Sequence, residues 1–233
     1  MNLLSLVQAF CDRTALSCPS SVISSSDAKI NQIRALLEEE VNDLASRHNW
    51  QGLTREATFT TIAAEDQGNI NTIASQGYKS IVNNTIWDRT DHLPCAIMDG
   101  VAWQTIKGFS NVGIRWKFRL RGDKLLLAPT PPAGHSWAFE YQSKWGIVDA
   151  DTGLLKQFFT KDTDTLMLQD TLHLEGLRWR WRREKSLDYA EYFNTYEMQV
   201  KAAMGEDGGA PNLNFNAGFG IGHAIPQEGS WFK

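Results

Sequence analysis

The sequence predicts an α+β fold, in which helices from both ends of the chain form a bundle and a central antiparallel β domain lies between them. Apolar residues recur at three- and four-residue steps near the N-terminus, and similar spacing returns after about residue 154. Between these regions, apolar and basic residues alternate strictly over residues 114–121. We therefore expect four segments. They are N-terminal helices (1–53), an antiparallel β-rich domain (54–150), a C-terminal helical hairpin that completes the bundle (151–204) and an extended C-terminal arm (205–233).

Composition narrows the classes of protein that the chain can belong to. A chain of 233 residues with 42% hydrophobic residues can bury a sizeable core. The formal net charge of -4 lacks the basic excess of a sequence-independent nucleic-acid binder. Three cysteines without a CxxC motif, and a start without signal-peptide features, favour a reducing cytoplasm. No stretch approaches the roughly 20 apolar residues of a membrane span, so we expect no membrane partner.

The N-terminal segment is predicted to contain two amphipathic helices. The first covers residues 2–16, and the second follows Ser24 and Asp27, which resemble a capping box. The second helix spans about 20 residues and carries one apolar stripe. The stripe consists of Ile30, Ile33, Leu37, Val41 and Leu44. Residues 38–40 are all glutamate and lie mostly off the stripe, so we expect a solvated face rather than an acidic binding patch.

The β domain is predicted from alternation and from turn residues. A β-branched run at 57–63 indicates a strand, and residues 64–110 indicate loops with short strands. Residues 114–121, a turn at Gly122-Asp123 and the return at 125–127 predict a hairpin with a buried face and a wet, basic face. The basic face carries Arg115, Lys117, Arg119 and Arg121. We expect residues 137–141 to form the third strand of the same meander.

Two helices are predicted near the C-terminus. The first covers residues 168–183, and the second runs from an N-cap at Ser186 to about Met204. So short a link favours an antiparallel hairpin. In the first helix, Trp179 and Trp181 point about 200° apart, so they cannot form one platform for stacking bases. We expect one to pack inside the domain and the other against a partner, while the arginines pair with acids such as Asp188, Glu191 and Glu197.

The segment after Met204 is rich in Gly, Asn and Ala, and aromatic residues are spaced along it. Such a segment cannot bury enough surface to fold alone. We therefore expect an arm that becomes ordered against a neighbouring subunit.

Motifs of catalysis and of metal or cofactor binding are missing from the sequence. No two histidines have metal-ligand spacing, and neither a GxSxG nor a Walker A motif occurs. The acid pairs Asp149/Asp151 and Asp162/Asp164 lie near turns, where carboxylates usually accept from local backbone donors. We therefore expect no catalytic, cofactor or metal site. Two alternatives stay open, namely a tail-associated wall-degrading hydrolase using acids such as Asp149 or Asp162, and a carbohydrate-binding module.

Several segments together carry a resemblance to a known family. They are the Gly-Leu-Arg-Trp-Arg-Trp run at 176–181, the Leu-Asp-Tyr-Ala-Glu run at 187–191, the turn at 121–125 and the proline-rich stretch at 129–134. In this combination and order the chain resembles the head-to-tail adaptor proteins of short-tailed bacteriophages, also called tail tubular protein A. The family's proline near residue 168 is missing, and residues 64–110 match no signature.

The resemblance implies a structural protein of the virion neck, assembled in the host cytoplasm. The family forms a ring, usually of twelve copies, between the portal protein and the tail nozzle protein, and the ring continues the channel for DNA ejection. Genomic DNA would pass through it without sequence-specific binding. The expected subunit or portal interface comprises Arg178, Trp179, Arg180, Trp181, Arg182, Phe215, Phe219, Ile221, Trp231 and Phe232. The basic hairpin face, residues 115–121, is a candidate for contact with the channel or a partner.

Overall fold

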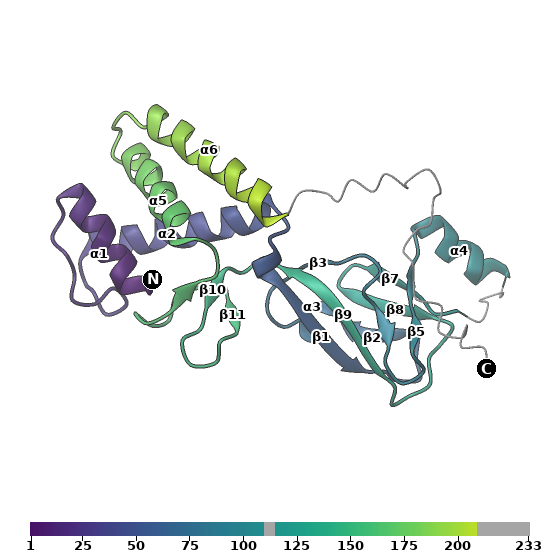
Figure 1. The fold of residues 1–233 in the computed structure, drawn as a ribbon. Coiled ribbons are helices and arrows are strands. Elements are labelled where there is room, and N and C mark those ends of the chain that lie inside the picture. Colours follow the sequence, from purple (N-terminus) through teal and green to yellow (C-terminus); the bar gives the residue numbers. More distant parts are fainter. Residues whose placement is uncertain (110–114, 209–233) are drawn as a thin grey trace, which may run out of the picture.

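The structure is a computed structural model that describes residues 1–109 and 115–208, and it contains both helices and mainly antiparallel sheets (Figure 1). The predicted α+β class is confirmed at this level. Figure 1 shows two lobes, one containing the four longest helices and the other most of the strands. In the described residues, no helix is long and apolar enough to cross a membrane.

The helical lobe combines segments from both ends of the described chain. Its helices are α1 (Leu3–Thr14), α2 (Ala28–Arg47), α5 (Asp170–Glu184) and α6 (Ala190–Asp207), with the short 3-10 helix η1 (Gln51–Leu53) after α2. A small sheet of β10 (Ile147–Val148), β11 (Leu155–Lys156) and β12 (Thr165–Leu166) lies beside them. The helical spacing expected from about residue 154 is therefore wrong up to residue 169, because short strands and turns precede α5.

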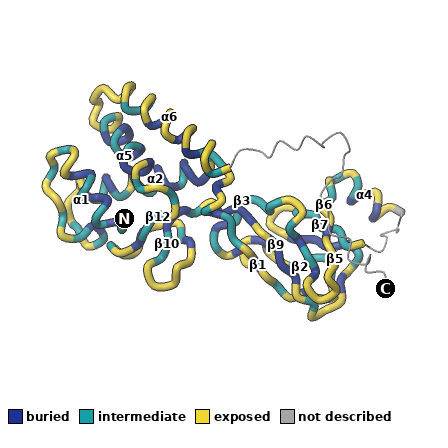
Figure 2. The backbone as a smooth tube through the Cα atoms, in the orientation of Figure 1, coloured by how far each residue is buried: buried dark blue, intermediate teal, exposed yellow. Residues whose placement is uncertain are grey.

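The predicted apolar stripe of α2 is confirmed, since its five residues are all buried. Four of them pack with α1 and α5 in one core, while Leu44 belongs to a second core with α5 and α6. Figure 2 shows α2 and α5 largely buried while much of α6 is exposed. The helix begins differently from the prediction. Asp27 is the N-cap and accepts from Lys29 N, whereas Ser24 bonds to Ser21, so the predicted capping box is wrong.

The link between α5 and α6 also differs from the prediction. Ser186 has a φ of 55° and terminates α5 instead of capping α6. Its N–H donates to Arg183 O, and Leu187 N donates to Arg182 O, which satisfies two carbonyls at the end of α5. Helix α6 then begins at Ala190, with Tyr189 at the N-cap position. The predicted Ser186 N-cap is wrong because the end of α5 already uses this residue.

The β lobe consists of two sheets. In the first, β9 (Ser136–Ser143) pairs with β1 (Thr54–Thr60), β3 (Tyr78–Ile81) and β4 (Trp87–Asp88), and β4 pairs with β5 (Leu93–Pro94). In the second, the order is β2 (Asp66–Asn69), β8 (Lys124–Ala128), β7 (Lys117–Arg121) and β6 (Ala96–Ile97), with β6 and β7 parallel. The lobe's main core, which includes Phe118, Leu127, Trp137 and Phe139, draws side chains from both sheets.

Two predictions for this lobe are wrong. Strand β9 is not the third strand of the β7–β8 meander, because the proline-rich stretch leads the chain into the other sheet, where β9 pairs along the whole of β1. The hairpin's basic face is not fully wet either. Helix α4 (Gly100–Phe109), which the sequence analysis missed, places Trp103 against Leu126, and the guanidinium of Arg119 donates to Gly100 O.

The two lobes meet at the C-terminal end of α2. Lys79 of β3 donates from Nζ to the carbonyls of Ala45, Ser46 and His48, at 3.1 to 3.2 Å. A cation at this end of a helix is stabilised by the helix dipole and by the last carbonyls, which have no partner within the helix. Lys79 therefore fixes β3 against the end of α2.

Candidate functional site

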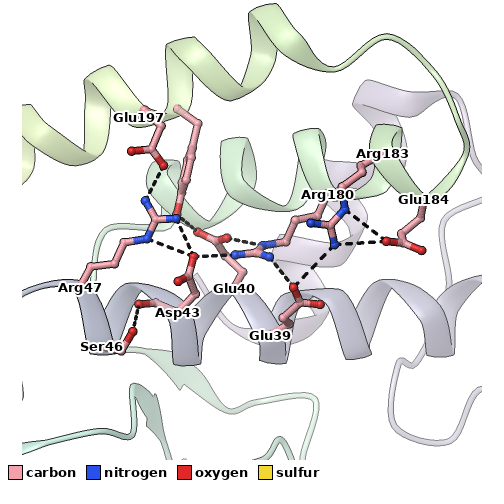
Figure 3. A network of polar contacts seen from close by, with 10 residues as sticks. Glu39, Glu40, Asp43, Ser46, Arg47, Arg180, Arg183, Glu184 and Glu197 are labelled. Carbon is pink, nitrogen blue, oxygen red and sulfur yellow. Dashed lines mark hydrogen bonds and ion pairs between the residues drawn. The ribbon is translucent and has the colours of Figure 1, made fainter.

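A buried arginine forms the polar centre of the helical lobe (Figure 3). Arg180 of α5 is 4% exposed and donates to three carboxylates of α2. Its Nε lies 2.7 Å from Glu40, its Nη1 lies 2.5 Å from Glu39, and its Nη2 lies 2.7 Å from Asp43. A planar guanidinium presents its donors in a rigid fork, which fixes the positions of the three carboxylates more closely than the rotatable ammonium of a lysine would. The site therefore locks α5 onto α2.

Glu40 extends this centre to α6. Its side chain is fully buried, and Tyr196 of α6 donates a hydrogen bond of 2.6 Å to it. Burial raises the pKa of Glu40, while the hydrogen bonds from Tyr196 and Arg180 oppose this effect. Burial also disfavours the charged form of Arg180, but the hydrogen bond that Arg180 donates to Glu40 and the negative charges of Glu40, Glu39 and Asp43 together outweigh it, so the pKa of Arg180 is raised. Three helices thus depend on one buried ion pair.

The expectation of a solvated face at residues 38–40 is wrong for Glu40. Glu40 follows Leu37 by three residues and precedes Leu44 by four, so helical spacing alone places it on the buried stripe. Its partner Arg180 lies 140 positions away. The spacing was enough to predict that Glu40 is buried, but it could not identify Arg180 as its partner.

The two tryptophans of α5 point in different directions, as predicted, and both pack within the chain. The Trp179 ring lies 5.1 Å from that of Phe193 on α6, and the Trp181 ring lies 5.9 Å from that of Phe10 on α1. Together with Arg180 they are between 4% and 7% exposed. The interface role expected for Trp179, Arg180 and Trp181 is therefore corrected, because their side chains are already used inside the subunit.

The expected acidic partners of these arginines are also corrected. Glu197 pairs with Arg47 of α2, and Arg182 donates to the backbone oxygen of Asp188 rather than to its carboxylate. In the described chain, Glu191 forms no ion pair with an α5 arginine, and its backbone oxygen accepts from Thr195 of α6. The buried arginine of α5 thus pairs with acids of α2 and not with the predicted acids near and within α6.

The outer side of the α5–α6 pair keeps exposed apolar and basic groups. Arg178 and Arg182 both lie over the ring of Tyr192, 4.5 and 4.4 Å from its centre. Leu187 and Tyr189 in the α5–α6 link and Met198 within α6 are exposed, and we call these three residues the α6 surface. The interface role of Arg178 and Arg182 stays a prediction.

A second exposed apolar surface lies on the β lobe. Ile97 of β6 is 58% exposed and Val101 of α4 is 79% exposed, and we call this pair the α4 surface. Figure 1 shows α4 and the α5–α6 link at opposite ends of the molecule. Along the nearby basic strand, Arg115 and Arg121 are exposed, while Lys117 and Arg119 are half-buried. Contact of these residues with a channel or partner stays a prediction.

Three of the four acids near turns accept from backbone donors, but the prediction that these donors are local is wrong for Asp162, whose donors lie 139 and 140 positions away. Asp151 pairs with the Lys161 side chain instead. Asp149 accepts from two N–H groups of its own turn, Asp162 from Val22 and Ile23, and Asp164 from three backbone N–H groups. These hydrogen bonds tie the turns and loops around Asp149, Asp162 and Asp164 together.

His173 of α5 is fully buried, and neither ring nitrogen has a hydrogen-bond partner among the described residues. Burial lowers its pKa to about 4. The unfolded chain would bind a proton below about pH 6.5, whereas the folded chain stays neutral to about pH 4. The contribution of neutral His173 to the free energy of unfolding is therefore fully present above about pH 6.5. It is lost as the pH falls from about 6.5 to about 4.

We expect the His173→Leu variant to lose this pH dependence. Between about pH 7.5 and about pH 5, the wild-type chain should lose roughly 2 kcal/mol more in its free energy of unfolding than the variant does. Urea unfolding at the two pH values measures the difference. The exposed His92, replaced by Asn, is the control and should behave like wild type; equal losses in all three proteins would contradict the assignment.

The predicted arm residues Phe215, Phe219, Ile221, Trp231 and Phe232 lie outside the described residues. No known protein family model matches the chain, and no curated protein matches it in sequence.

Proposed function

We propose that the protein is a structural, non-enzymatic head-to-tail adaptor of a short-tailed bacteriophage. It forms a ring between the portal and the tail nozzle and continues the DNA channel. The observation that carries the proposal is the pair of exposed apolar surfaces at opposite ends of a two-lobed subunit. A subunit that joins two different neighbours needs two separate adhesive surfaces, and exposed apolar groups near arginine are typical of protein interfaces.

The helical lobe supports this role through its rigidity. In the proposal, the N- and C-terminal helices form the bundle, and the buried Arg180 centre holds α2, α5 and α6 in one arrangement. A surface that is already ordered loses less conformational entropy on binding. The α6 surface is thus presented on a preorganised support, as a portal contact would require.

The overall charge supports passage of DNA rather than its capture. The chain has a formal net charge of -4, and four of its α2 and α5 arginines are paired with acids, namely Arg47, Arg178, Arg180 and Arg183. A basic stripe free to neutralise phosphates would instead increase nonspecific affinity. We therefore propose that DNA moves through the channel without being bound tightly by this chain.

The first test mixes the purified chain with portal rings of the same phage and measures the masses of the products by native mass spectrometry. We expect a defined complex with many copies of this chain, and addition of the nozzle protein should extend it. If the chain remains unbound in the presence of portal rings, the proposal fails. Turnover of peptidoglycan by the chain would favour the hydrolase alternative.

Two surface variants test the two contact surfaces separately. Met198→Glu on the α6 surface and Val101→Glu on the α4 surface should each change the free energy of unfolding by less than about 0.5 kcal/mol. Each should weaken a different step of assembly by more than about tenfold, because a charge would be buried at the interface. Leu154→Glu, an exposed apolar position in the β10–β11 turn, is the matched control and should assemble normally. Normal assembly of both test variants would show that these surfaces are not interfaces.

A further inference from the structure

We infer a binding site for one divalent transition-metal cation of the zinc type in the β lobe, formed by Asp88, Asp91 and His135. Each residue offers one ligand atom, and the three atoms lie within 4.8 Å of one another. The inference is independent of the adaptor proposal, because it rests on the geometry of these side chains alone.

The distances fit a tetrahedral ion. His135 Nδ1 lies 3.0 Å from Asp88 Oδ2 and 3.7 Å from Asp91 Oδ2. With metal–ligand bonds of about 2.0–2.1 Å, two ligands of a tetrahedral zinc ion are about 3.3 Å apart. The two distances bracket this value, so each carboxylate lies at about the separation from His135 Nδ1 that a shared tetrahedral ion requires.

The backbone holds the three residues in place without any ion. Asp88 ends β4, and its Oδ1 accepts from Thr90 N and Asp91 N, which leaves Oδ2 directed at His135. The backbone of His135 is bonded at both its N–H and its carbonyl to Thr61, at the end of β1. The site is therefore preorganised by two strands of the same sheet.

Charge gives a second argument for a cation. Two carboxylates face the same imidazole nitrogen, and Asp91 makes no other ion pair within the described residues. The basic neighbour Arg89 is already paired with Glu56. Even a protonated imidazole leaves one negative charge in excess, whereas a divalent cation would neutralise both carboxylates.

The donor set selects the class of metal. One imidazole nitrogen and two carboxylate oxygens suit zinc and neighbouring transition metals, while calcium and magnesium prefer oxygen ligands alone. Asp88 is fully buried but the Asp91 side chain is 47% exposed, so an ion can enter from solvent and keep a water as its fourth ligand. Bound there, the ion would tie the β4–β5 turn to the start of β9.

This site could not be found from histidine spacing. Asp88 and His135 are 47 positions apart, and only the pairing of β4 with β9 brings them together. Metal-binding motifs with short spacing are absent from the sequence, which is why no metal was expected.

The test treats the full chain with a chelator and then adds Zn²⁺, with binding measured by isothermal titration calorimetry and native mass spectrometry. We expect one Zn²⁺ per chain, a higher melting temperature in its presence, and the visible absorption of tetrahedral Co²⁺ when cobalt is used instead. Asp91→Asn and His135→Gln should each weaken binding by more than about tenfold.

Asp123→Asn is the matched control, since this aspartate is exposed on the β7–β8 turn of the same lobe. It should bind Zn²⁺ like wild type. If His135→Gln does not fold, Asp91→Asn decides the question. The Asp91 carboxylate makes no hydrogen bond in the described chain, so this replacement should leave the fold intact. Absence of bound zinc in the wild type, or equal binding by Asp91→Asn and Asp123→Asn, would overturn the inference.

Discussion

Replacement of Arg180 by methionine is expected to lower the free energy of unfolding by about 3–5 kcal/mol, because it leaves a buried carboxylate without its counter-charge. Glu40 is fully buried and would keep only the hydrogen bond from Tyr196. Methionine preserves much of the apolar stem, so the loss reports on charge more than on packing. Urea unfolding followed by circular dichroism measures the effect.

A control on the same helix separates the buried arginine from ordinary surface charge. Arg178→Met removes a half-exposed arginine that pairs with Glu175, and it should cost no more than about 1 kcal/mol. The double variant Arg180→Met, Glu40→Met should recover part of the loss, because both buried charges are then gone. If Arg180→Met costs no more than Arg178→Met, the ion pair is not what joins the helices.

Replacement of Gly176 by alanine is expected to destabilise the chain by about 2–3 kcal/mol, even though alanine is the better helix former. A Cβ at this position would overlap the carboxylate of Glu40. A flexible carboxylate on a surface could move aside. Here it is held by Arg180 and Tyr196, so its displacement would break buried hydrogen bonds.

Gly205 of α6 provides the opposite case. A Cβ there meets nothing within 4 Å, so Gly205→Ala should raise the free energy of unfolding by about 0.5–1 kcal/mol. Thermal or urea unfolding of the two variants compares one chemical change in two surroundings. Equal effects of both variants, of either sign, would show that the contact between Gly176 and Glu40 is unimportant.

Local periodicity was sufficient for the elements that have one clearly apolar face. The stripe of α2 and the alternation in β7 and β9 follow directly from the spacing of side chains along a helix or a strand. The β7–β8 turn at Gly122-Asp123 was predictable as well, because glycine accepts the positive φ of 60° found there. These features depend on neighbours in sequence.

Features that depend on distant segments were not predictable in the same way. Alternation in β9 indicates a strand but does not say that its partner is β1 rather than β8. Helix α4 has ten residues and begins at a glycine, so it offers few turns over which its apolar spacing can repeat. The partners of Arg180 and of His135 are fixed only by the tertiary arrangement.

The junction at Lys79 gives the two lobes a mechanical linkage. One ammonium group is bonded to three carbonyls at the end of α2, and α2 is bonded through Glu40 to α5 and α6. A displacement of α2 along its own axis would move all three acceptors together and pull β3 with them. A force on the helical lobe is thereby transmitted to the β lobe through the hydrogen bonds of Lys79 as well as through the covalent chain.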